Sequence, residues 1–179
     1  GAGQLAVPLA WMLARAGYRV IGAAARTPAS AARLVGGIAD ARAYDGAQQL
    51  ADDADMVFIA VPDDAIAAAT AAVRWQARHS VLHCSGATEV AALADAAAAG
   101  ASVGGFHPLQ SFTNTKAAMQ TLPGCTVGIE ADEPLLGVLT AMAQALGCRP
   151  IRLPPGSRAL YHASGSFASS FLVGLINDA

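Results

Sequence analysis

A small set of polar residues follows apolar, strand-like stretches of the chain. His107 stands in Gly-Gly-Phe-His-Pro-Leu-Gln-Ser-Phe. A histidine there could accept a proton when an alcohol is oxidised by loss of a hydride, or it could hold the loop through a backbone hydrogen bond; both interpretations stay open. Ser85, in His-Cys-Ser-Gly, could donate to a ribose or substrate oxygen. Tyr161 and His162 could contact a substrate from the last helix, or they could belong to a packed helix that needs no site.

The first residues carry a glycine pattern that suits phosphate binding. The chain begins Gly-Ala-Gly-Gln-Leu-Ala, which matches G-x-G-x-x-A. Gly1 permits a tight turn and Gly3 lets the backbone approach a pyrophosphate, while Gln4 and Leu5 bring free N–H groups to the positive end of a helix. The alternative is a glycine-rich turn in an α/β protein that binds another ligand. The strand and helix series behind the turn favours a dinucleotide.

The end of the next expected strand indicates which dinucleotide. NAD enzymes usually place Asp or Glu there, but no acidic residue occurs between Gly1 and Asp40. Arg26 and Thr27 occupy this position instead. A planar, permanently charged guanidinium suits a 2′-phosphate, so the sequence favours NADP over NAD. The alternative is a solvated arginine at a strand end.

A proline and two aspartates end the clearest strand, residues 55–62. Its continuous apolar run predicts a parallel strand covered on both faces. The loop through Val61 and Pro62 would line the nicotinamide or its ribose, because ligands of such sheets bind at the carboxyl ends of the strands. Asp63 or Asp64 could instead cap the following helix, and both interpretations can hold together.

Apolar stretches of strand length alternate with alanine-rich helical stretches. This alternation predicts an α/β fold, a Rossmann-like, doubly wound, mostly parallel sheet. Its first strand would be missing, because nothing precedes Gly1, so we expect a fragment that unfolds without normal cooperativity. Residues 1–154 would form the NADP-binding domain and residues 155–179 the start of an all-helical domain, with Pro-Pro-Gly at the boundary. The expected strands are 18–24, 55–62, 80–84, 102–106, 125–129 and 149–153, and the longer helices are 5–13, 65–75, 89–99 and 133–146.

Composition narrows the class of protein. Hydrophobic residues make up 54% and charged residues 13% of the 179 residues, which argues for a packed core. With a net charge of −2 and no basic cluster, a nucleic-acid partner is not expected. No apolar run reaches the length of a membrane span, and a cytoplasmic protein is expected. Three cysteines without a C-x-x-C pair argue against a disulfide framework and a metal site. A nucleophilic Cys84 would need a lowered pKa, for which only His83 stands nearby.

Several runs together resemble a family of dehydrogenases that join an N-terminal Rossmann-like domain to a C-terminal helical domain of unknown function. These runs are GAGQLA, DMVFIAVPDDAI, HCSGA, GGFHPLQSF, LPG and RALYHASGSFASSFLVGL, and they cover nearly the whole chain in the family's order. The wider superfamily includes prephenate dehydrogenase, pyrroline-5-carboxylate reductase, 6-phosphogluconate dehydrogenase and coenzyme F420-dependent NADP reductases.

The resemblance implies NADP binding and a helical domain that often mediates dimers, so a homodimer is expected of the full-length protein. It supplies no substrate. In prephenate dehydrogenases a similar His-Pro pair follows a strand and its histidine is catalytic, and His107-Pro108 matches that pair locally. The chain departs from the family near Ser170, where the resemblance suggests an asparagine.

The sequence therefore predicts an NADP-dependent oxidoreductase. Hydride would pass between the nicotinamide and a small carbonyl, imine or alcohol held between two domains. His107 would transfer the proton, with Ser85 and His162 as supporting polar groups. The alternatives are a prephenate-type dehydrogenase and a non-catalytic, NADP-binding regulatory protein.

Overall fold

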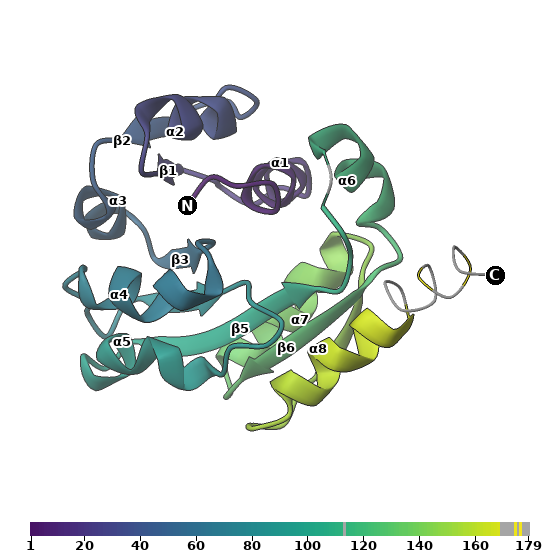
Figure 1. Ribbon diagram of the computed structural model, residues 1–179. Helices are drawn as coiled ribbons and strands as arrows, with labels where there is room; N and C mark the ends of the chain where they lie inside the picture. Colours follow the sequence, from purple (N-terminus) through teal and green to yellow (C-terminus); the bar gives the residue numbers. More distant parts are fainter. Residues whose placement is uncertain (113, 169–173, 175, 177–179) are drawn as a thin grey trace.

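The fold is an α/β arrangement of two sheets, taken from a computed structural model that describes residues 1–112, 114–168, 174 and 176. A small parallel sheet pairs β1 with β2, and a larger sheet has the order β3-β4-β5-β6-β7 (Figure 1). The strands are β1 (Gly22–Ala24), β2 (Arg42–Tyr44), β3 (Met56–Ile59), β4 (Ser80–His83), β5 (Ser102–Pro108), β6 (Thr126–Ala131) and β7 (Arg149–Arg152).

The direction of the strands determines which strand ends lie at the same edge of the sheet. β3, β4 and β5 are parallel, so their carboxyl ends share one edge of the sheet. β6 runs antiparallel to β5, and β7 is parallel to β6. The amino ends of β6 and β7 therefore lie at the edge where β5 ends. The prediction of a mostly parallel, Rossmann-like sheet is confirmed.

Helices cover both faces of the larger sheet, because successive strand side chains point to opposite sides. Leu82 and Phe106 pack with α7 residues such as Leu139, whereas Val81 packs on the other face with Ile66 of α4 and Leu93. The helices are α1 (Ala6–Arg15), α2 (Pro28–Val35), α3 (Ala47–Asp53), α4 (Ile66–Ala71), α5 (Ala94–Ala98), α6 (Thr115–Thr121), α7 (Leu135–Ala145) and α8 (Arg158–Ser166), with short 3-10 helices η1 (Asp63–Ala65) and η2 (Val90–Leu93).

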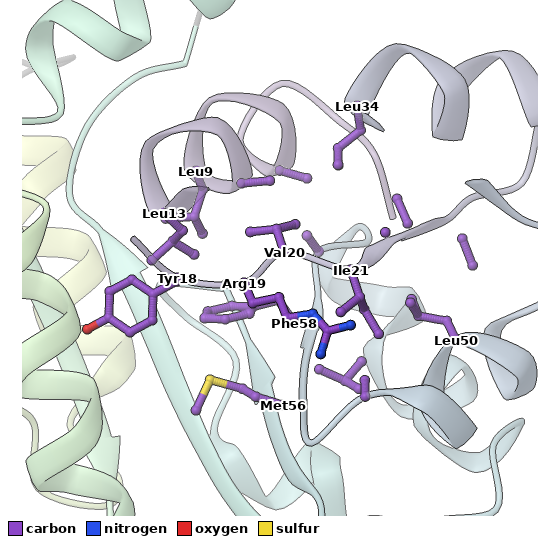
Figure 2. Close-up of a pocket in the computed structure, with 18 of the residues that line it drawn as sticks. Leu9, Leu13, Tyr18, Arg19, Val20, Ile21, Leu34, Leu50, Met56 and Phe58 are labelled. Atoms are coloured by element: carbon purple, nitrogen blue, oxygen red, sulfur yellow. The ribbon is translucent and has the colours of Figure 1, made fainter. Parts of the chain in front are cut away.

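A cavity of about 340 Å³ separates the two sheets. Among the described residues, β1 pairs only with β2 and β3 pairs only with β4, so each presents an open edge to this space. Figure 2 shows Val20 and Ile21 facing it from the β1 side, and Met56 and Phe58 from β3. The cavity lies where the sequence analysis expects the first strand of the sheet. Gly1 also lines it.

The cavity explains two differences from the sequence-based expectations. Residues 18–21 line the cavity outside any strand, so β1 begins at Gly22 rather than at Tyr18. The expectation that both faces of residues 55–62 would be covered is wrong, because Met56, Val57 and Phe58 are only half-buried. The short β2 and α6 were not expected, and the expected helix 65–75 ends at Ala71. Among the described residues, no helix is both long and apolar enough to cross a membrane.

Candidate functional site

The glycine turn lies against the end of β3 and leaves the start of α1 open. A Cβ on Gly1 would collide with the Ala60 carbonyl group and lie 3.3 Å from Val61, so only glycine permits this approach. A Cβ on Gly3 would meet nothing within 4 Å. No side chain caps α1, and its first turn holds no acidic residue. The open, positive end of this helix suits an anion. Gln4 is exposed and Leu5 is half-buried at this end.

Arg26 and Thr27 follow β1 and differ in the hydrogen bonds that their side chains make. Arg26 is exposed and has no hydrogen bond or ion pair with the part of the chain that the structure describes. Thr27 is the N-cap of α2: its hydroxyl accepts from the Ser30 amide at 3.3 Å and donates to the Ser30 hydroxyl at 2.8 Å. The guanidinium is therefore available to a ligand, whereas the threonine hydroxyl already stabilises a helix terminus.

Asp63 and Ser85 join the ends of β3 and β4. Pro62 leads from Val61 into η1, where the Asp63 carboxylate accepts from the Ser85 hydroxyl at 2.6 Å. The same hydroxyl oxygen accepts from the Thr88 amide at 2.9 Å and the Ala87 amide at 3.2 Å. Ser85 is 6% exposed. Because its single proton goes to Asp63, Ser85 shapes the loop after β4 in this structure, and its contact with a ligand stays a prediction.

A buried ion pair anchors α8 to these strand ends. Arg158 is fully buried, and its Nε donates to Glu130 of β6, while Nη1 donates to the Ser85 carbonyl at 2.8 Å. The Glu89 carboxylate accepts from the amides of Gly156 and Arg158, so it caps the start of the helix. The guanidinium lies against Gly105, where any Cβ would collide with it. One arginine thereby joins the loop after β4 to the middle of β5 and the end of β6.

His107 of β5 faces α8. Its Nδ1 lies 3.2 Å from the Tyr161 hydroxyl, which donates to the His107 carbonyl at 3.2 Å. A hydroxyl has one proton, so it accepts from Nδ1–H, which leaves Nε2 as the unprotonated nitrogen. The ring centroid of exposed His162 is 5.7 Å from that of His107. A Cβ on Gly86 would lie 2.9 Å from Nε2 and collide with His162, so the glycine makes room for both rings.

Burial sets the protonation states in this cluster. Burial, and then the nearby His162 and Arg158, lower the pKa of His107 to about 4. Burial and Arg158 lower the pKa of His83 to about 4 in the same way. Both imidazoles are therefore neutral near pH 7. Nδ1 of His83 already accepts from the Ser85 amide, whereas Nε2 of His107 keeps its lone pair. Burial raises the pKa of Tyr161 to about 12 and that of Cys84 to about 12, which argues against a Cys84 thiolate nucleophile.

The structure brings the predicted residues into two neighbouring groups. One group is the glycine turn with Val61 beside it, and the other holds Ser85, His107 and His162 around Gly86 and Asp63. The pairing of Glu130 with Arg158 was not predicted from the sequence. Arg158 carried a signal, since it is a lone charge in a small-residue stretch, whereas Glu130 is followed closely by Asp132 and Glu133 and does not stand out. Ser170 lies outside the described residues. No cluster of three or more metal-ligating side chains occurs in the described ranges.

Two family models match parts of the chain. Residues 1–87 match the family described as NADP oxidoreductase, coenzyme F420-dependent. Residues 125–179 match a domain of unknown function, DUF2520. This confirms the predicted resemblance, and at the level of the family it confirms NADP as the cofactor. No curated protein is significantly similar in sequence.

Solved structures confirm the fold. A candidate NADP oxidoreductase from Bacteroides fragilis is 22% identical over 98% of this chain and 66% of its own, with a TM-score of 0.76. A reductive aminase from Aspergillus terreus, in complex with NADPH and ethyl-5-oxohexanoate, is 17% identical over 99% of this chain and 61% of its own, with a TM-score of 0.75. Prephenate dehydrogenase from Aquifex aeolicus is 15% identical over 100% of this chain and 70% of its own, with a TM-score of 0.72. The chain thus spans about two thirds of the length of these structures.

Proposed function

We propose that this chain is the NADP-binding part of an oxidoreductase that moves a hydride between the nicotinamide and a small carbonyl, imine or alcohol. The observation that carries the proposal is the open start of α1. The helix has no side-chain cap, no acid in its first turn and free space around Gly3. A pyrophosphate on these amides would place the rest of the cofactor over the carboxyl ends of β1, β3 and β4.

Arg26 supports NADP rather than NAD. Its exposed guanidinium follows β1, at the side of the turn where the adenosine ribose of such cofactors binds, and nothing described in the chain neutralises it. The reductive aminase of the same fold binds NADPH. Val61 and Pro62 would border the nicotinamide half of the cofactor, since Val61 lies beside Gly1.

His107 is the proposed proton-transfer group. Its Nε2 is the unprotonated nitrogen, and the lowered pKa keeps the imidazole neutral at pH 7, so this lone pair is available to accept a proton in alcohol or amine oxidation. In the reductive direction the same nitrogen would first need a proton, which its low pKa opposes. Ser85 and His162 would border the substrate beside it. The reducing cofactor supplies the hydride when bound, and these side chains orient the substrate.

Binding and turnover test the proposal separately. Isothermal titration with NADPH and NADH, on the parent protein and on Arg26→Ala, should show tighter NADPH binding that falls about tenfold in the variant. NADH affinity should stay unchanged. Equal affinity for both cofactors, or no change in Arg26→Ala, overturns the phosphate assignment.

Turnover is then followed by nicotinamide absorbance, with small keto acids, imines and alcohols. His107→Ala should lower kcat at least about a hundredfold while NADPH affinity is retained. Normal turnover in His107→Ala removes the proton-transfer role. Tight NADPH binding without turnover on any substrate favours a regulatory protein, and turnover of prephenate alone favours the prephenate-type alternative.

A further inference from the structure

Two cysteines lie in contact where β6 and β7 begin. The Sγ atoms of Cys125 and Cys148 are 3.7 Å apart. Cys125 directly precedes Thr126, and Cys148 directly precedes Arg149, and these following residues are partners in the parallel ladder. The two cysteines are therefore neighbours in register, although 23 positions separate them in the sequence.

Backbone hydrogen bonds hold the two residues side by side. The Gly124 amide donates to the Gly147 carbonyl at 2.7 Å, before the cysteines, and the Arg149 amide donates to the Cys125 carbonyl at 2.8 Å. Both glycines adopt positive φ, 88° and 73°, so the chain enters the two strands through matching turns. The thiols are thus fixed by the ladder on either side of them.

This arrangement is compatible with a covalent bridge. Neighbouring strands lie about 4.8 Å apart, within the Cα separation of about 4.4–6.8 Å that a disulfide spans. The sulfur atoms would have to close from 3.7 Å to about 2 Å, which side-chain rotation can supply. Cys84, the third cysteine, is buried and has no such neighbour among the described cysteines.

The two thiols differ in access and reactivity. Cys125 is half-buried, whereas Cys148 is 6% exposed. The hydrogen bond from the Cys125 thiol lowers the pKa of Cys148 and raises the pKa of Cys125. Cys125 is therefore the sulfur that a small reagent can reach, and Cys148 is suited to attack it from inside.

We propose that Cys125 and Cys148 form a reversible intramolecular disulfide by exchange with a small disulfide such as oxidised glutathione. As the Cys125 sulfur attacks the reagent, its proton passes to the Cys148 sulfur to which it already donates, a mixed disulfide forms and one glutathione thiolate leaves. That thiolate takes the proton back from Cys148. The Cys148 thiolate then attacks the Cys125 sulfur and releases the second. The two protein thiols lose two electrons and two protons, and one oxidised glutathione becomes two reduced molecules.

A disulfide between these cysteines would lie close to His107 of the candidate functional site. The Leu109 amide donates to the Thr126 carbonyl at 2.8 Å, two residues after His107 on β5 and one residue after Cys125. A disulfide would fix the start of β6 against β7 at this point. It would also reduce the conformational entropy of the unfolded chain, so the midpoint of thermal unfolding should rise by about 5–10 °C. The proposal does not depend on the proposed oxidoreductase activity.

The parent protein itself provides the decisive test. After incubation with oxidised glutathione, the intact mass should fall by two hydrogen atoms, and peptide mapping should join Cys125 to Cys148. Dithiothreitol should reverse both changes. Three free thiols after incubation, or glutathione that remains attached to the protein, overturns the proposal.

Variants assign the partners. Cys84→Ser should still form the bridge and show the thermal shift, whereas Cys125→Ser and Cys148→Ser should not. In Cys148→Ser, the mixed disulfide on Cys125 should accumulate, because no second thiol resolves it. A thermal shift that persists in Cys148→Ser would contradict the bridge as its cause.

Discussion

The strand-end cluster around Arg158 and the glycine turn around Gly3 lie at neighbouring edges of the fold but are built in opposite ways. Around Arg158, polar groups are buried, and other parts of the chain bind most of them. Around Gly3, no side chain caps the helix start, and Arg26 has no hydrogen bond or ion pair with the residues that the structure describes. In the first region, the polar groups bind other groups of the protein. In the second region, they are available to bind a ligand.

This contrast separates the expected effects of mutations. Changes in the strand-end cluster should alter the free energy of unfolding, because they leave buried charges or donors without partners. Changes at the glycine turn should alter nucleotide affinity and leave the fold unchanged. The variants below test this separation, beginning with the largest expected effect.

Arg158→Met should destabilise the protein most. It leaves the Glu130 carboxylate buried without its cation and frees the Ser85 carbonyl, which should cost about 3–5 kcal/mol in urea unfolding. Arg42→Met is the matched control, since Arg42 forms an exposed pair with Asp53, and its loss should change stability little. A loss in Arg158→Met no greater than in Arg42→Met would show that the buried pair is not the anchor.

A buried histidine should make the cluster sensitive to acid. The pKa of His83 is about 4 in the folded protein and about 6.5 in the unfolded chain. The unfolded state therefore binds the extra proton between these values, so stability falls as the pH drops from 6.5 to 4, by about 3 kcal/mol in total. Above pH 6.5 this histidine contributes no pH dependence.

His83→Asn isolates that contribution. The asparagine oxygen can replace Nδ1, which accepts from the Ser85 amide at 3.2 Å, but it does not titrate. Urea unfolding at several pH values should give a shallower loss of stability between pH 6.5 and 4 than in the parent. Equal slopes in His83→Asn and the parent would assign the acid sensitivity to other groups.

The same contrast explains what the sequence could predict. The glycine turn and the alternation of strands with helices are local patterns in the sequence. The Rossmann-like fold class and the residues at the strand ends could therefore be predicted. The partners of these residues are not local. Glu130 and Arg158 are 28 positions apart and meet because β7 runs parallel to β6, so the chain that follows β7 comes back beside the end of β6. Ser85 was predicted as a free donor because the sequence does not show that Asp63 takes its proton.

Substitutions of two glycines, one in each region, test the comparison with the smallest expected effects. A Cβ on Gly105 would collide with the Arg158 guanidinium, so Gly105→Ala should displace it and cost about 1–3 kcal/mol in urea unfolding. A Cβ on Gly3 would meet no protein atom within 4 Å, so Gly3→Ala should leave stability unchanged. The added methyl group would instead occupy the space where a pyrophosphate approaches, and NADPH affinity should fall about tenfold in titration.

Each glycine variant is the control for the other. Gly105→Ala should retain NADPH affinity once the measurement is made below its unfolding transition, because the Arg158 guanidinium binds Glu130 and the Ser85 carbonyl rather than the glycine turn. If Gly3→Ala binds NADPH as the parent does, the open space at the start of α1 is not where the phosphates bind. If Gly3→Ala unfolds as readily as Gly105→Ala, the turn is part of the stabilising framework and the two regions are not separable.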